Sequence, residues 1–257
     1  MPRQRARRAR RGTPPCAQRH RSGHAEKPGL AQPMHRSGAF VANSVPMHRT
    51  ARLAASAALG YAIGSIPSGV LVGRLSRGID VREHGSHSMG MANVLRTAGR
   101  GPAAITLALD IGKGAAAARL GKALTGDRAG GATAGLGAVI GHSWPVFVGF
   151  RGGKSSATLF GAASVITPPV AGVSLIAGVG ALAVTRKTSV LSLSGSIAGG
   201  LAALALGLRR RDAAGLALAL PGVAVVIFRH RENIDRLLRG VEPAVGDPEM
   251  SDPAPTA

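Results

Sequence analysis

The sequence is poor in cysteine, in aromatic side chains and in acidic residues. Its single cysteine, Cys16, excludes a disulfide within the chain and a metal cluster built on cysteines. Phe, Trp and Tyr together make up 3% of the 257 residues, whereas glycine occurs 37 times. This composition argues against a soluble core of bulky aromatic side chains. Small residues on apolar segments instead suit helices that pack closely in a lipid bilayer.

The shortage of acidic residues leaves the chain strongly basic. It has 12 Asp and Glu against 32 Lys and Arg, which gives a net charge of +20. Residues 1–50 hold eleven of the basic residues and one acid, and they show no apolar periodicity. We expect a disordered basic tail there, or a start assigned too far upstream with Met34 or Met47 as later starts. No apolar segment of a signal peptide follows the arginine run. We expect no nucleic-acid partner, because neither interleaved aromatics nor a known binding module accompanies the tail.

The apolar residues are concentrated beyond Arg52. The mean hydropathy is +0.17 despite the many charges. Six apolar stretches approach the ~20 residues of a spanning helix: 53–73, 102–124, 131–150, 157–184, 189–208 and 213–228. The fourth is too long for one span, and Thr167-Pro168-Pro169 interrupts it, so it predicts two helices. We therefore predict an all-α integral membrane protein with about seven transmembrane helices over residues 51–240.

The basic residues also predict an orientation. They gather at 74–100, 151–154, 186–187 and 229–239. With seven crossings and the N-terminus outside, all four clusters face the cytoplasm, as the positive-inside rule prefers. Two basic segments then fall outside, against the rule: the N-terminal tail and Arg209-Arg210-Arg211. A late start removes the conflict for the tail. The sequence does not explain the position of the three arginines. We expect residues 241–257, which are acidic and rich in proline, to be a disordered tail.

Each basic cluster lies in a loop rich in small polar residues. Glycine brings backbone amides close to an anion, and Ser, Asn and Arg add donors. Gly152-Gly153-Lys154-Ser155 would place amides and an ammonium at a helix N-terminus, although it lacks the upstream glycine of a nucleotide-binding phosphate loop. Any one of these loops could be a mere connector. Four on one membrane face predict a cytoplasmic pocket for a phosphorylated substrate whose other half lies in lipid.

Three of the ionisable residues inside predicted helices are candidates for function: Asp110, Lys113 and His142. Asp110 and Lys113 are three residues apart, on one helix face. Charges in a membrane are costly, so both are functional candidates. The alternatives are an ion pair that orients the helix, or a lysine that snorkels to the surface. His142 is either a catalytic residue or a hydrogen-bonded structural one.

These loops, in this order, resemble those of the bacterial acyl-phosphate:glycerol-3-phosphate acyltransferase family (PlsY), over roughly residues 57–243. The matching segments are Gly64-Ser-Ile-Pro67, the loop from Asp80 to Arg96, Asp110-Ile-Gly-Lys113-Gly114, Gly141-His142 through Lys154, and His230-Arg-Glu-Asn233-Ile. The resemblance implies a multi-pass enzyme of phospholipid synthesis in the cell membrane. Such an enzyme transfers a fatty acyl group from acyl phosphate to the 1-hydroxyl of glycerol 3-phosphate, giving lysophosphatidic acid and phosphate. Its partners are these two substrates and membrane lipid, and neither a cofactor nor a metal is expected.

The resemblance also implies which residues form the site. The catalytic residues are expected to be Ser86, Lys154, His230 and Asn233. The substrate-binding residues are expected to be Ser86, Asn93, Arg96, Lys154, Ser189, His230 and Asn233. Arg96 and Lys154 would clamp phosphate groups, because charge-assisted hydrogen bonds are strong. Loop amides would stabilise charge on the attacked carbonyl. Acyl phosphate is already activated, so positioning can suffice and a substrate phosphate can accept the hydroxyl proton.

The chain departs from the family pattern at five positions: His87, Ser88, Met91, Ala92 and Ser155. His87 replaces glycine, which restricts the backbone if that position needs a positive φ. Ser155 also stands where the family pattern has glycine. Ser88 replaces asparagine and so lacks an amide donor. An alternative to the enzyme is therefore a catalytically altered paralogue, or a membrane protein that binds or transports a phosphorylated ligand through the same loops.

Overall fold

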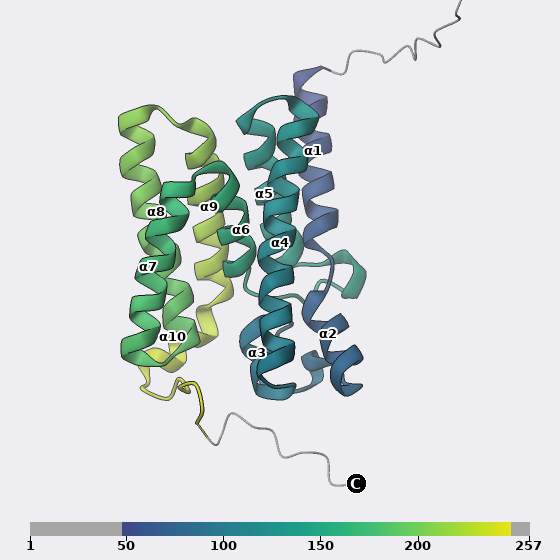
Figure 1. Ribbon diagram of the computed structural model, residues 1–257, viewed down its shortest axis with the longest axis vertical. Helices are drawn as coiled ribbons and strands as arrows, with labels where there is room; N and C mark the ends of the chain where they lie inside the picture. The colour runs from purple at the N-terminus through teal and green to yellow at the C-terminus, as the bar shows by residue number, and fades with distance from the viewer. Residues whose placement is uncertain (1–47, 248–257) are drawn as a thin grey trace, which may run out of the picture. The chain divides into compact units, whose positions relative to one another are not determined.

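The computed structural model describes residues 48–247, and every regular element in this range is a helix (Figure 1). The predicted basic tail, except for its last residues, and the chain from residue 248 lie outside the described part. The first helices are α1 (Arg49–Gly64), α2 (Ser68–Arg77), α3 (Met91–Thr97), α4 (Arg100–Thr125) and α5 (Arg128–Ser143). They are followed by α6 (Ser156–Ile166), α7 (Pro168–Thr185), α8 (Thr188–Arg210), α9 (Ala213–Arg229) and α10 (Arg231–Leu238). Two short 3-10 turns, η1 (Val81–Glu83) and η2 (Val146–Val148), lie in the loops.

Proline sets two of the helix boundaries. The predicted break in the long apolar stretch is confirmed, because α6 ends at Ile166 and α7 begins at Pro168. A second break divides the stretch 53–73 between α1 and α2, with Pro67 at the N-cap of α2. Hydropathy runs through this position without a change, so the apolar pattern alone did not predict it.

Several helices are suited to a bilayer by length and composition. In the described part of the chain, three segments are long and apolar enough to span: Arg49–Arg77, Pro168–Thr185 and Thr188–Arg210. A fourth is added if α9 and α10, which are bent by 59° at their junction, count as one span. The number seven therefore remains a prediction.

The bundle consists of two groups of helices, which are joined by α6 and by the direct packing of α5 against α9. On one side α1, α4 and α5 pack together, and on the other α7, α8 and α9 do so (Figure 1). The short α6 packs against both α4 and α7. Its contact with α4 needs glycine, because a Cβ at Gly114 would overlap the carbonyl of Thr158. This close approach agrees with the prediction that small residues mediate helix packing.

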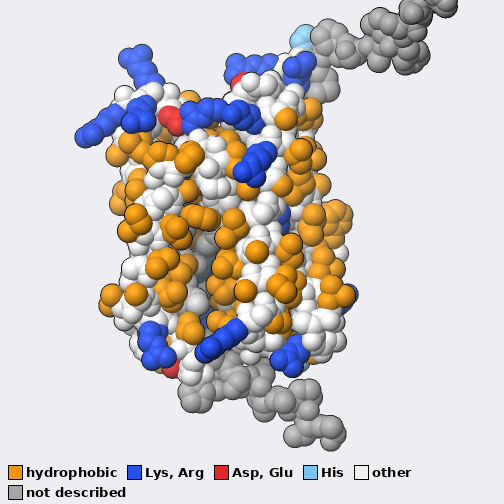
Figure 2. Space-filling model, viewed as in Figure 1, with side chains coloured by type: hydrophobic (Ala, Val, Ile, Leu, Met, Phe, Trp, Pro, Cys, Tyr) orange, Lys and Arg blue, Asp and Glu red, His pale blue; other side chains and the backbone are white. Residues whose placement is uncertain are grey.

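The outer surface has an apolar middle and basic ends. Figure 2 shows hydrophobic side chains along the length of the bundle and Lys and Arg gathered at both ends. Large apolar side chains on α7 and α8, such as Ile176 at 77% and Leu201 at 63%, are exposed in the middle. A surface of this kind is stable when lipid covers it.

The two ends of the bundle differ in structure. One end, which we call the loop end, carries α2, α3, α10 and the long loop 78–90 (Figure 1). The long loop 144–155 is tied to the loop 78–90 by the hydrogen bond from Arg82 to Val148 O. The other, the turn end, carries the short connections α4–α5, α6–α7 and α8–α9.

Candidate active site

A cavity of about 320 Å³ extends from the loop end into the bundle. All seven predicted substrate-binding residues line it: Ser86, Asn93, Arg96, Lys154, Ser189, His230 and Asn233. Deeper in the bundle its walls are apolar, with side chains from α6 to α9 that include Phe160, Val170, Leu175, Val179 and Val223. The cavity therefore has a polar, cationic mouth and an apolar interior.

A chain of hydrogen bonds crosses the mouth. The Lys154 ammonium donates to the side-chain oxygen of Asn233. The Asn233 amide in turn donates to Glu242 Oε1 over 2.7 Å. Arg236 Nε donates to the other oxygen of Glu242, also over 2.7 Å. Two predicted catalytic residues, 79 positions apart in the chain, are thus held in direct contact.

Glu242 is a site residue that the sequence reasoning missed. It lies in the segment 241–257, which was expected to be a tail, yet its side chain is buried. The described start of this segment folds back onto the α7–α8 turn, where Val245 N donates to Arg186 O over 2.7 Å. Burial alone would raise the pKa of Glu242, but hydrogen bonds from Ser189, Asn233 and Arg236 together outweigh burial and lower it. Its carboxylate is therefore a fixed negative charge among the cations.

Lys154 loses its proton at a lower pH than a lysine in water does. Burial, assisted by the positive charges of Arg236 and Arg96, lowers the pKa of Lys154 to about 8. Glu242 acts in the opposite direction. An anion bound at Lys154 would restore the preference for the ammonium, so the site favours a phosphate ligand.

His230 presents a defined ring nitrogen. Its Nδ1 lies 2.8 Å from the carbonyl oxygen of Val226. A carbonyl oxygen only accepts, so Nδ1 carries the proton and Nε2 is the free acceptor. The side chain lines the cavity, which makes Nε2 available to a substrate hydroxyl.

The loop between α2 and α3 is organised by Asn93. Its side-chain amide donates to the carbonyls of Val81, His84 and Ser88, over 2.6, 3.1 and 2.8 Å. Its oxygen accepts from the backbone amide of Ser86 over 2.8 Å. All the polar atoms of this side chain are committed to the loop, so we assign Asn93 to positioning Ser86 rather than to direct contact with substrate.

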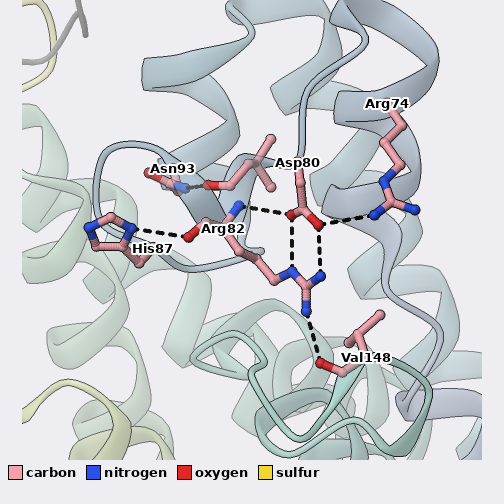
Figure 3. A network of polar contacts seen from close by, with 7 residues as sticks. Arg74, Asp80, Arg82, His87, Asn93 and Val148 are labelled. Carbon is pink, nitrogen blue, oxygen red and sulfur yellow. Dashed lines mark hydrogen bonds and ion pairs between the residues drawn. The ribbon is translucent and has the colours of Figure 1, made fainter.

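A second network fixes the start of this loop (Figure 3). Asp80 caps η1 and binds the guanidinium of Arg82 through both carboxylate oxygens, at 3.0 and 2.7 Å. The hydrogen bond from Arg82 holds the pKa of Asp80 at about 2. Arg82 also donates to the carbonyl of Val148 over 2.8 Å, which ties this loop to the 144–155 loop.

Two of the residues that replace a family glycine adopt a left-handed backbone. The φ angles are 53° at His87 and 63° at Ser155. Both side chains make compensating contacts. His87 Nδ1 lies 3.0 Å from the carbonyl of Arg82. Ser155 Oγ lies 2.7 Å from Val139 O and 2.6 Å from Ser143 Oγ. The loops therefore retain a glycine-like conformation without glycine.

Ser155 gives a test of this compensation. We expect Ser155→Gly to be more stable than Ser155→Ala by about 1 kcal/mol, because both lose the hydroxyl but only glycine relieves the left-handed strain. The order should reverse at Ser164, inside α6, where glycine is less stable than alanine by about 0.5–1 kcal/mol. Thermal unfolding in detergent measures both pairs, and the same order at the two positions would contradict the assignment of strain.

The glycine pair before Lys154 is held from two sides. Arg229 Nε donates to Gly153 O over 3.0 Å, and its guanidinium lies 5.7 Å from the centre of the Trp144 ring. On the other side a Cβ at Gly153 would overlap the ring of His142, whose carbonyl accepts from Gly153 N over 2.9 Å. His142 thus supports the loop, which favours the structural interpretation of this residue. The supporting role of Arg229 was not foreseen from the sequence.

Asp110 and Lys113 form a buried ion pair beside the cavity. Lys113 Nζ lies 3.0 Å from Asp110 Oδ1 and donates to the carbonyl of Ile66 over 3.0 Å. Asp110 Oδ1 also accepts from Ser68 Oγ over 2.5 Å, and His142 Nδ1 lies 3.4 Å away. Lys113 thus satisfies a carbonyl that the break between α1 and α2 leaves without a helical partner. This arrangement favours the alternative in which the pair orients the helix.

The chain is similar to known acyltransferases over most of its length. Residues 54–240 match the family model described as glycerol-3-phosphate acyltransferase. A glycerol-3-phosphate acyltransferase of Gloeobacter violaceus is 45% identical over 196 residues, which cover 74% of this chain and 94% of that protein. Another, of Synechococcus sp. strain JA-3-3Ab, is 47% identical over 187 residues, covering 73% and 90%.

A solved structure is similar as well. The crystal structure of PlsY, an integral membrane glycerol 3-phosphate acyltransferase, in its glycerol 3-phosphate form matches with a TM-score of 0.68 at 34% identity. The match covers 76% of this chain and 96% of that one. Its lysophosphatidic acid form matches with a TM-score of 0.67 at 33% identity.

Proposed function

The chain belongs to the glycerol-3-phosphate acyltransferase family of integral membrane enzymes, and from this membership we propose its donor, product and catalytic residues. The donor is a fatty acyl phosphate, and the acceptor is the 1-hydroxyl of glycerol 3-phosphate. The hydroxyl oxygen forms a bond to the acyl carbon, and the bond from that carbon to the phosphate oxygen breaks. The products are lysophosphatidic acid and inorganic phosphate.

The form of the cavity is the observation that carries this proposal. A fatty acyl phosphate has an anionic head and an apolar chain, and the cavity has a cationic mouth and apolar walls in the same order. Arg96 and Lys154 at the mouth supply the positive charge. The hydrogen bonds that these charged donors make to a phosphate are stronger than bonds between neutral groups. Burying the acyl chain against the apolar walls stabilises the complex by ~25 cal/mol per Å² of apolar area removed from water.

Each polar residue at the mouth has a role that follows from its geometry. Lys154, fixed by Asn233, holds a substrate phosphate, and Arg96 holds a second one. Ser86, whose loop Asn93 maintains, donates its hydroxyl to a substrate oxygen. Ser189 is a buried hydroxyl that lies beside Glu242 and lines the cavity, so it too can contact a substrate oxygen. The backbone amides of the two loops stabilise negative charge on the attacked carbonyl oxygen.

The proton of the acceptor hydroxyl goes to an oxygen of a substrate phosphate. His230 Nε2 accepts the hydrogen bond from this hydroxyl and passes the proton on to that phosphate oxygen. Phosphate is a good leaving group, so holding the two substrates in line supplies most of the rate acceleration. No covalent acyl-enzyme is needed.

The test is an assay of the purified protein in lipid with palmitoyl phosphate and glycerol 3-phosphate, with an active relative run alongside. We expect lysophosphatidic acid and phosphate to form in equal amounts, and palmitoyl-CoA not to replace the donor. A folded sample that forms neither product would point to another substrate or to a binding role, and would show that His87, Ser88 or Ser155 is not tolerated. Product from palmitoyl-CoA alone would overturn the choice of donor.

The lowered pKa of Lys154 predicts the pH dependence. In the free enzyme this residue loses its proton above about pH 8. The kcat/KM for glycerol 3-phosphate should therefore fall about tenfold per pH unit above that point. Lys154→Arg should lose this fall, because a guanidinium stays charged over the whole range. Initial rates between pH 6.5 and 9.5 measure the profile, and a flat wild-type profile would exclude a required ammonium at Lys154.

We also propose that the loop end faces the cytoplasm. It carries the larger share of Lys and Arg, which supports this orientation under the positive-inside rule. A cysteine introduced at the exposed Arg239, in a chain whose Cys16 is replaced by serine, provides the test. An impermeant thiol reagent should label it in inverted membranes and not in intact cells.

A further inference from the structure

A second cavity, of about 280 Å³, opens at the turn end of the bundle, opposite the polar mouth of the first cavity, and Val170 lines both. It lies where the start of α5, the α6–α7 turn and the α8–α9 turn meet. Its lining includes Arg128, Thr167, Leu206, Arg210, Arg211 and Asp212. The cavity therefore combines three guanidinium groups, one carboxylate and an apolar wall.

The charges in this cavity are not balanced. Arg128 is already engaged, because its Nη2 donates to Asp212 Oδ2 over 2.8 Å and to Ile166 O over 2.6 Å. Asp212 also caps α9 by accepting from Gly215 N over 3.0 Å. Arg210 and Arg211 make neither an ion pair nor a side-chain hydrogen bond within residues 48–247. Two positive charges thus remain for a ligand.

Arg211 occupies a position that suits glycine. Its φ is 52°, in the left-handed region at the C-cap of α8. Glycine would end the helix there without strain. An arginine at this strained position is explained if its guanidinium binds a ligand.

The outer surface of α8 below Arg211 is apolar. Leu201, Leu204 and Leu208 are spaced to lie along one side of α8 and are 63%, 39% and 68% exposed. This ridge leads up to the α8–α9 turn, at the end of a helix long and apolar enough to span the bilayer. Figure 2 shows the same change along the bundle, from hydrophobic side chains to Lys and Arg at the end. Cations at this level lie at the depth of lipid phosphates.

We propose that this cavity binds an anionic membrane lipid. Arg210 and Arg211 hold its phosphate, and its acyl chains lie along Leu201, Leu204 and Leu208. The shared chemistry is that of any phosphate, but the leucine ridge favours a lipid over a free anion. This role explains why Arg209-Arg210-Arg211 lies at the end of the bundle where the positive-inside rule disfavours basic residues.

The test compares lipid retention by the full chain and its variants. The protein is purified in neutral detergent, and binding of phosphatidylglycerol and phosphatidylcholine with the same acyl chains is measured by native mass spectrometry. The variant R210Q/R211Q removes both free cations. K122Q/R209Q is the matched control, because it changes the charge equally at the same end with residues that do not line the cavity. R210Q alone leaves the left-handed position unchanged, and the melting temperature of each variant reports folding.

We expect wild type and K122Q/R209Q to bind phosphatidylglycerol at least about tenfold more tightly than phosphatidylcholine. R210Q/R211Q should remove this preference, R210Q should reduce it, and inorganic phosphate at millimolar concentration should not compete. An equal loss of the preference in K122Q/R209Q would show that the net positive charge at this end, and not the cavity, causes the preference. Loss in K154A and not in R210Q/R211Q would place the lipid in the first cavity. Competition by inorganic phosphate would show a site for free anions. Each of these three results overturns the proposal.

Discussion

Replacing Lys154 with alanine should lower the kcat/KM of acyl transfer by about 100- to 1,000-fold, the range found when one preorganised donor to a developing charge is removed. Lys154 is the lysine that lines the polar mouth, and Asn233 fixes its ammonium there. Without it a substrate phosphate would face Arg96 with part of its negative charge unmatched. Steady-state assays with both substrates varied measure the loss.

The control for this prediction is Lys122→Ala, which removes an exposed lysine from the last turn of α4 at the turn end. It should stay within about twofold of wild type, because surface charges remote from a site contribute little. Lys154→Arg should retain more activity than Lys154→Ala, since it keeps the charge with altered geometry. Unchanged turnover in Lys154→Ala, with an unchanged melting temperature, would remove Lys154 from the site.

Breaking the buried ion pair should cause the largest loss of stability. Lys113→Met leaves the Asp110 carboxylate without its lysine and takes one of two donors from the Ile66 carbonyl, which keeps the Ser68 amide. A buried charge that loses its partner costs about 3–5 kcal/mol of unfolding free energy. The measurement is reversible unfolding in bicelles, with the yield of monodisperse protein as a second readout. Arg119→Met, on the exposed side of the same helix, should change stability by less than about 1 kcal/mol.

A double variant separates the pair from its surroundings. Asp110→Leu combined with Lys113→Met removes both charges, and apolar replacements of a buried ion pair are often tolerated. We expect the double variant to lose less unfolding free energy than the two single variants lose together, by about 2 kcal/mol or more. Simple additivity would mean that each residue is held by other neighbours rather than by the pair.

The fold was predictable where a local signal exists. Pro168 removes a backbone donor and restricts Thr167, so a helix boundary could be placed there from the sequence alone. The break before Ser68 was harder, because its chemistry depends on a distant residue. The carbonyl of Ile66 accepts from the Lys113 side chain, 47 positions away, as well as from the nearby Ser68 amide. Hydropathy averages over a window and does not report such a contact.

The site was predictable through its resemblance to a family and not through spacing. Lys154 and Asn233 meet because α6 to α9 fold between them, and nothing local to either residue indicates the other. Glu242 was missed because an acid in a proline-rich segment is typical of a tail. Its burial depends on the reversal of the chain after α10, which brings Val245 against Arg186.

The four hydrogen bonds of the Asn93 side chain have a consequence for ligand affinity. Fixing the backbone of one residue costs roughly 1–2 kcal/mol of conformational entropy. In a loose loop, that cost would be subtracted from the binding free energy each time a substrate arrives. Here it is met during folding, so Ser86 and its neighbouring amides are already in place in the empty enzyme. A small, highly hydrated acceptor such as glycerol 3-phosphate offers few contacts, and it gains most from a loop that does not have to be ordered first.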